Sequence, residues 1–149
     1  MDDSTHKQIL DIIDEHRIMT IATVRPDGYP QATTVTYVHD GLALYFACGR
    51  SSQKVSNIRQ NPRVSLTIDH DEEDVNRIRG ISLGGRAEVL APDGPEYRRA
   101  LELMATRFPE LKTVPESEMQ EIAVVKVVPE VISLLDYTKG FGHTELVRV

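Results

Sequence analysis

The sequence contains no tryptophan and only one cysteine, Cys48. A lone thiol cannot form an internal disulfide, and the opening Met-Asp-Asp-Ser lacks the basic and apolar regions of a secretory signal, so we expect a cytoplasmic protein. With five Tyr and three Phe, the chain is not expected to build an aromatic platform for bases or sugars. No apolar run approaches the roughly 20 residues that a membrane-spanning helix needs.

Basic residues are also too few for a nucleic-acid-binding surface. The chain has 17 Lys and Arg against 23 Asp and Glu, a formal net charge of −6, whereas such surfaces concentrate basic residues. It has no nucleophile elbow, Walker loop or dinucleotide glycine fingerprint, and no paired His or Cys at metal-ligand spacing. We therefore expect no metal, leave the catalytic residues unassigned, and expect any chemistry to come from a bound cofactor.

The length fits one domain over residues 1–149, and 40% hydrophobic with 27% charged residues is globular. Residues rich in Val, Ile and Thr recur between turn signals, which predicts strands. The strands are expected at 18–24, 31–38, 42–48, 64–68, 75–90, 122–128 and 131–135, helices at 5–16, 52–60 and after Pro95, and loops at 108–118 and 136–143. Without βαβ alternation, this pattern favours an antiparallel barrel with helical covers.

The stretch from Arg50 to Pro62 combines anion-binding groups with a helix start. Ser52, or Ser51 before it, suits the N-cap, and Pro62 cannot continue the helix. The helix start would present free N–H groups and a positive dipole end beside Arg50 and Lys54, which suits a phosphate. The alternative is an ordinary capped surface helix that binds only water.

Thr33, Thr34 and Thr36 place hydroxyl groups on both faces of the second predicted strand. One interpretation is a polar, planar ligand that lies along this strand. The other is the strand propensity of threonine at a half-exposed edge.

Several short motifs together resemble the pyridoxamine-phosphate-oxidase-like family of FMN-binding split barrels. Ser52-Gln-Lys54, followed by Asn57-Ile58 and the run Asn61 to Leu66, is similar to the phosphate-binding helix of the family and the strand after it. Gly28-Tyr-Pro30 and the stretch Gly41 to Ala47 are similar to the first two turns and the third strand.

The resemblance implies a mainly β, six-stranded antiparallel Greek-key split barrel with flanking helices, and a homodimer that holds FMN at the subunit interface. Arg50, Ser52 and Lys54 would hold the FMN phosphate, with Gln53 nearby. The flavin ring and ribityl chain would lie along Thr33, Thr34, Val35 and Thr36, and Phe46 and Ala47 would complete the wall of the cofactor pocket. Phe141 or His143 would approach the partner's flavin.

Two departures separate this chain from true pyridoxamine phosphate oxidases. Those enzymes carry an Arg in the second strand, near the place where this chain has Thr33. They also carry an Arg-x-His near the C-terminus, whereas this chain has Gly142-His143 and, later, Arg148. Oxidation of pyridoxamine phosphate is therefore not expected.

The leading hypothesis is a flavin reductase or other FMN-dependent oxidoreductase that passes electrons from a reduced nicotinamide to a small acceptor. One alternative keeps the fold but binds a deazaflavin. Another is a dimeric, non-enzymatic module that binds FMN or haem for storage or sensing, with His143 as an axial ligand.

Overall fold

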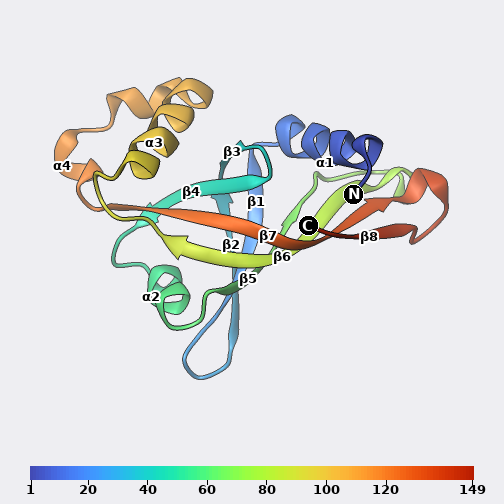
Figure 1. The fold of residues 1–149 in the computed structure, drawn as a ribbon, viewed down its shortest axis with the longest axis horizontal. Coiled ribbons are helices and arrows are strands. Elements are labelled where there is room, and N and C mark those ends of the chain that lie inside the picture. The colour runs from blue at the N-terminus through green and yellow to red at the C-terminus, as the bar shows by residue number, and fades with distance from the viewer.

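One curled antiparallel sheet with helices packed against it makes up the chain (Figure 1). The computed structural model describes residues 1–149. The strands are β1 (Ile18–Val24), β2 (Pro30–Thr36), β3 (Val38–Asp40), β4 (Ala43–Gly49), β5 (Arg63–Ile68), β6 (Arg79–Val89), β7 (Ile122–Asp136) and β8 (Thr144–Arg148). The helices are α1 (Asp3–Glu15), α2 (Gln53–Gln60), α3 (Pro95–Arg107) and α4 (Glu116–Met119), with 3₁₀ turns η1 (Val75–Arg77), η2 (Pro109–Thr113) and η3 (Tyr137–Lys139).

Six strands curl around one core in the order β2-β1-β5-β6-β7-β4, and each neighbouring pair is antiparallel. Strands β2 and β4, at the two ends of this series, contact each other, so the sheet closes back on itself. Strand β3 extends the sheet beyond β4, and β8 pairs with the second half of β7. The mainly β split barrel that the sequence predicts is confirmed.

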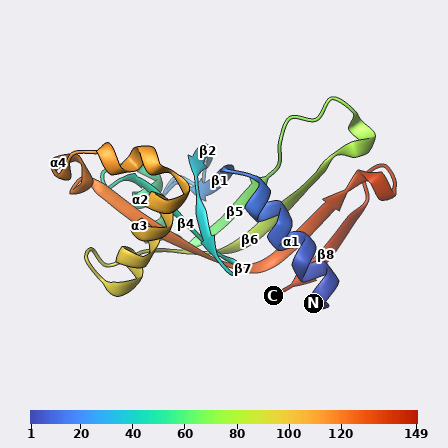
Figure 2. The same ribbon diagram turned by 90° about the horizontal axis from the view of Figure 1, so that it is seen from above.

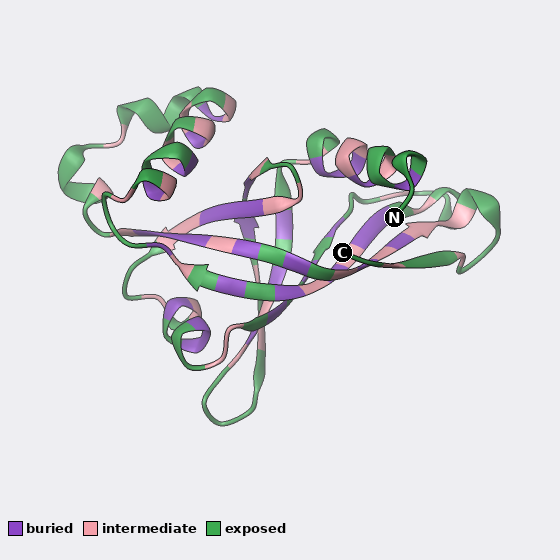
Figure 3. Ribbon diagram, in the orientation of Figure 1, coloured by how far each residue is buried: buried purple, intermediate pink, exposed green.

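Alternating apolar side chains fill the barrel. Along β5 the side chains alternate strictly between exposed and buried, as a strand with one solvated face requires. Helix α1 lies across the sheet (Figure 2), and its Ile9, Ile12 and Ile13 belong to the same core. Each fully buried aliphatic side chain contributes about 1.5–3 kcal/mol to the stability of the folded state. The buried positions lie on the sides of the helices and strands that face the core (Figure 3).

A second, smaller core lies between α3 and strands β4 and β7. Tyr45 projects into it from the face of β4 that points away from the barrel, and its hydroxyl donates to Glu96 of α3 at 3.1 Å. The ammonium group of Lys126 on β7 lies 2.5 Å from the same carboxylate. Both faces of β4 are therefore covered.

Three predicted strand boundaries differ from the structure. Residues 122–136 form one strand rather than two, because Pro129 lies opposite Gly85 at a register shift, and irregularities of this kind are where strands tolerate proline. The predicted strand 31–38 is two strands, because the chain leaves β1 after Thr36 and pairs with β4 from Val38 on. The predicted strand 75–90 begins with η1, and only Arg79–Val89 is extended.

Two segments predicted as loops contain regular structure. Residues 108–118 include η2 and most of α4, which a pattern interrupted by Pro109 and Pro115 did not indicate. The tail 136–143 contains η3 and leads into β8, a strand with mostly exposed side chains and therefore no apolar alternation to reveal it.

Candidate functional site

The turn between β4 and α2 creates the proposed anion site. The N–H of Ser52 donates to the carbonyl of Gly49 at 3.0 Å, and α2 then begins with Ser52 at its N-cap. The Ser52 hydroxyl makes no capping bond but donates to Cys48 Sγ at 3.7 Å. No acidic side chain lies in the first turn. The free N–H groups and the positive end of this helix therefore have no anionic partner within the chain.

Lys54 adds a cation on the side of α2 that faces Cys48. Its side chain is half-buried and has no ion-pair partner within the chain. Burial raises the pKa of the Cys48 thiol, while the Ser52 hydrogen bond and the positive charge of Lys54 lower it. Because burial has the largest effect, the thiol is protonated at neutral pH and is a poor nucleophile.

The side chain of Arg50 points to a different part of the structure from that of Lys54. Its Nη2 donates to the carbonyl of Ile122 at 3.0 Å. Arg50 and Ser52 line a shallow hollow of about 310 Å³ together with Arg59, whereas Lys54 lies outside it. Arg59 is not among the residues predicted from the sequence, although its position two helical turns after Ser52 places it on the same face of α2.

Gln53, itself exposed, belongs to a hydrogen-bond network centred on the buried Asn57. Its Nε2 donates to Asn57 Oδ1 at 2.8 Å, and Asn57 Nδ2 donates to Thr23 Oγ1 at 3.0 Å and to Gln31 Oε1 at 3.1 Å. Gln53 therefore supports the helix from within the chain. In the sequence, Asn57 is noted only as part of the motif that resembles the phosphate-binding helix of the family. The signal for its structural role was a polar amide on the apolar face of an amphipathic helix.

Strand β2 offers hydroxyl groups along the edge of the sheet. Thr34 and Thr36 are exposed, Thr33 is half-buried, and none of these three hydroxyls makes a hydrogen bond within the chain. The side chain of Val35 points into the barrel core. Because β2 pairs only with β1, it leaves backbone groups on its other side for a ligand or another chain.

An apolar cavity of about 310 Å³ lies where β2 and β4 end beneath α3 and η2. The lining residues are Thr36, Tyr37, Ala47, Cys48, Gly49, Met104, Phe108, Leu111 and Ile122. The structure therefore brings Thr36 and Ala47 together, next to the thiol that contacts Ser52. Phe46, in contrast, is fully buried in the barrel core.

The tail residues lie at the opposite end of the long β6–β7 ribbon from α2 (Figure 1). Phe141 is 78% exposed, and its only aromatic contact is an edge-on one with Tyr137, with ring centroids 5.7 Å apart. His143 is half-buried, and its ring makes no hydrogen bond within the chain. One chain alone does not bring these two residues to the other predicted site residues.

No group of three or more His, Cys, Asp or Glu side chains is arranged to hold a metal ion. The stretch 70–74, with four carboxylates beside a histidine, forms no such group. None of the helices combines the length and the hydrophobicity that crossing a membrane requires.

Residues 5–136 match the sequence profile of a family described as pyridoxamine 5'-phosphate oxidase. Among curated proteins, general stress protein 26 of Bacillus subtilis is 29% identical over 83 residues. The aligned part covers 56% of this chain and 58% of that protein, which is less than two thirds of its length.

Two solved structures show how widely the fold recurs. Protein Rv2991 from Mycobacterium tuberculosis superposes with a TM-score of 0.77 and 29% identity, over 97% of this chain and 91% of the other. A haem-binding protein from Mycobacterium smegmatis superposes with a TM-score of 0.81 and 21% identity, over 99% of this chain but 59% of the other.

Proposed function

Because this chain belongs to the pyridoxamine 5'-phosphate oxidase family, we propose that it is an FMN-binding oxidoreductase of the flavin reductase type. The observation that carries the proposal is the start of α2. A half-buried Lys54 without an anionic partner lies in a helical turn that contains no acidic residue. A dianionic phosphate would supply the missing charge for both the ammonium group and the free N–H groups.

The chemistry of the surrounding groups fits the rest of the cofactor. Thr33, Thr34 and Thr36 have hydroxyls without partners in the chain, which suits a polyhydroxyl chain and a polar ring edge. Ala47 would provide an apolar wall. Arg50 and Ser52 would bind the phosphate from the outer side of α2, and Gln53 would act through the network with Asn57.

Bound FMN would accept a hydride from a reduced nicotinamide and pass electrons to a small acceptor. The residues of this chain would bind and orient the cofactor and keep water from its ring. The thiol of Cys48, held protonated by burial, is not a nucleophile for this chemistry. Thr33 stands near the place where true pyridoxamine phosphate oxidases have an Arg, so pyridoxamine phosphate is not the proposed substrate.

We also propose that the protein acts as a homodimer. The tail between η3 and β8, which carries Phe141 and His143, lies at the opposite end of the β6–β7 ribbon from α2, so these residues would reach a flavin only in a partner subunit. Phe141 is 78% exposed, and Leu146 of the adjoining β8 is also exposed, so this part of the chain offers apolar side chains that a partner subunit would cover.

The first test measures FMN binding to the purified protein by absorption and by quenching of flavin fluorescence. The wild type should bind FMN, and Lys54→Ala should raise the dissociation constant about 10- to 100-fold, because it removes a charge-assisted phosphate contact of about 1.5–3 kcal/mol. Lys7→Ala, which removes an exposed lysine on α1, is the matched control and should not change the affinity. A wild type that takes up no FMN, or equal affinities for all three proteins, would contradict the proposal.

Haem binding is a second candidate function, because His143 is half-buried, its ring has no hydrogen-bond partner within the chain, and it follows the exposed Phe141 by two residues. Titrations with FMN, a deazaflavin and haemin separate the candidates. A haemin absorption band that disappears in His143→Ala would favour haem binding, and tighter binding of the deazaflavin would favour that cofactor.

A further inference from the structure

A single buried amide joins α2 to both strands of the first hairpin. Asn57 is completely buried in the middle of α2. Its Nδ2 donates to Thr23 on β1 and to Gln31 on β2, and its Oδ1 accepts from Gln53. Both N–H groups and the carbonyl of the carboxamide thus have partners, so the amide has one defined orientation.

The two strand residues that bind Asn57 form one cross-strand pair of the hairpin. Thr23 and Gln31 lie directly opposite each other in the β1–β2 register. Strand β1 is paired on both sides, with β2 and with β5, whereas β2 is an edge strand. The Asn57–Gln31 bond is the one side-chain hydrogen bond between α2 and β2. The position of β2 relative to α2 therefore depends strongly on the Asn57–Gln31 bond, whereas β1 is also held in place by its pairing with β5.

These two elements carry the two halves of the proposed cofactor site. Ser52 and Lys54 lie at the start of α2, and the hydroxyls of Thr33, Thr34 and Thr36 follow Gln31 along β2. We propose that Asn57 is a positioning residue, which fixes through Gln31 the spacing between the phosphate-binding helix and the strand along which the flavin lies. This inference rests on the proposed FMN site.

A purely structural role of Asn57 would make a different prediction. The bonds to Thr23 and Gln31 use the same donor nitrogen and have nearly the same length. Losing either one leaves an N–H without its partner and destabilises the fold. If Asn57 only stabilised the protein, the two losses would affect FMN binding alike. If it positions β2, only the loss at Gln31 would weaken FMN binding.

The experiment compares Gln31→Met with Thr23→Val, which remove one acceptor each and nearly keep the side-chain volume. Both variants should melt at a lower temperature than the wild type. Gln31→Met should raise the FMN dissociation constant about five-fold, the equivalent of one neutral hydrogen bond, while Thr23→Val leaves it unchanged. Gln31→Glu keeps an acceptor for Asn57 and should restore wild-type affinity. Unchanged affinity in Gln31→Met, or an equal loss in Thr23→Val, would overturn the proposal.

Amide hydrogen exchange without FMN gives a second readout. Exchange across β2 should be faster in Gln31→Met than in the wild type and in Thr23→Val. Equal exchange in all three proteins would overturn the positioning role. A wild type that binds no FMN would instead overturn the proposed function, and the exchange rates would still show whether Asn57 holds β2.

Discussion

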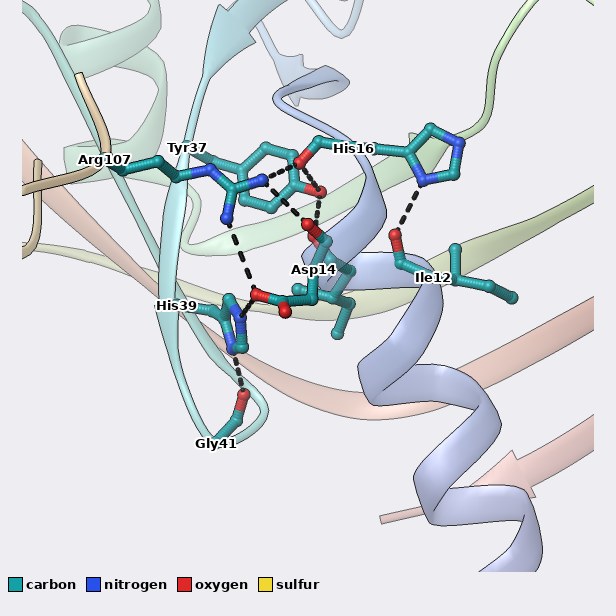
Figure 4. A network of polar contacts seen from close by, with 8 residues as sticks. Ile12, Asp14, His16, Tyr37, His39, Gly41 and Arg107 are labelled. Carbon is teal, nitrogen blue, oxygen red and sulfur yellow. Dashed lines mark hydrogen bonds and ion pairs between the residues drawn. The ribbon is translucent and has the colours of Figure 1, made fainter.

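At the scale of single residues, the C-terminus of α1 shows how the fold satisfies the carbonyl groups that a helix leaves free. The single Tyr37 hydroxyl proton is donated to the carbonyl of Ile13 at 2.6 Å, and the carbonyl of His16 lies 3.1 Å from the same hydroxyl oxygen. Arg107 from α3 donates to the carbonyls of Asp14 and His16, and Figure 4 shows these side chains converging on the helix end. Two distant elements are therefore tied to α1 by side chains rather than by backbone pairing.

Tyr37→Phe should lower the free energy of unfolding at pH 7 by about 1–3 kcal/mol, because the carbonyl of Ile13 is left buried without its donor. The side chain is only 1% exposed, so water cannot easily replace the hydroxyl. Urea denaturation measures the loss. Tyr29→Phe, at a 71% exposed position, serves as the control and should change the stability by less than about 0.5 kcal/mol.

Comparing the wild type with Tyr37→Phe also tests how the stability of the fold depends on pH in the alkaline range. Burial raises the pKa of Tyr37 far above its usual value, with the charge of Asp14 acting in the same direction and Arg107 opposing it. The folded state therefore keeps the phenol proton that the unfolded chain releases above about pH 10, and stability falls as pH rises past that value, by about 1.4 kcal/mol per pH unit. Tyr37→Phe should lose less stability above pH 10 than the wild type does. Parallel curves for the two proteins would contradict this.

At the scale of elements, the pairing of β6 with β7 depends on one close backbone approach. A Cβ atom on Gly85 would lie 2.5 Å from the carbonyl oxygen of Val128, whereas one on Gly84 would meet only a side-chain methyl of Val131, at 3.2 Å. The register shift between these two glycines is also where Pro129 enters the ladder. Gly85 thus allows β7 to run through a proline without a break.

Gly85→Ala should destabilise the protein by about 1–3 kcal/mol, because the new methyl group meets backbone that can move only by distorting the ladder. Gly84→Ala is the matched control and should cost clearly less, since a valine side chain can shift. Thermal denaturation of both variants checks the order. Equal losses would mean that the register shift tolerates a side chain at Gly85.

The sequence correctly predicted those elements whose ends are set by neighbouring residues, such as a helix cap or a proline. The bounds of β1 were correct, and α2 lies between Ser52 and Pro62 as expected, because a cap and a proline act at fixed positions. Strand β8 was missed, since its side chains are mostly exposed and only the pairing with β7 makes it extended. The network of Asn57 was missed for a related reason. Its partners are distant in sequence, and only the folded hairpin brings them together.

At the scale of the whole molecule, the site residues predicted from the sequence fall into two groups that lie at opposite ends of the folded molecule. Ser52 and Lys54 lie at the start of α2, and Thr36 lines the cavity beside Cys48. Phe141 and His143 belong to the tail between η3 and β8, at the other end of the β6–β7 ribbon (Figure 1). The long β6–β7 ribbon keeps the two groups apart within one chain. The family resemblance implies that both groups meet at one cofactor in a homodimer, whereas no periodicity or spacing in the sequence indicates a second copy.

The proposed homodimer makes Phe141 an interface residue, and this can be tested against an equally exposed aromatic residue. The wild type should sediment as a dimer at micromolar concentration. Phe141→Lys should weaken the dimer at least ten-fold, because it places a charge in a covered apolar contact, and should weaken FMN binding with it. Tyr29→Lys, at the tip of the first hairpin, should change neither quantity. A monomeric wild type, or a Phe141→Lys protein that stays dimeric with unchanged FMN affinity, would show that the tail does not complete a partner's site.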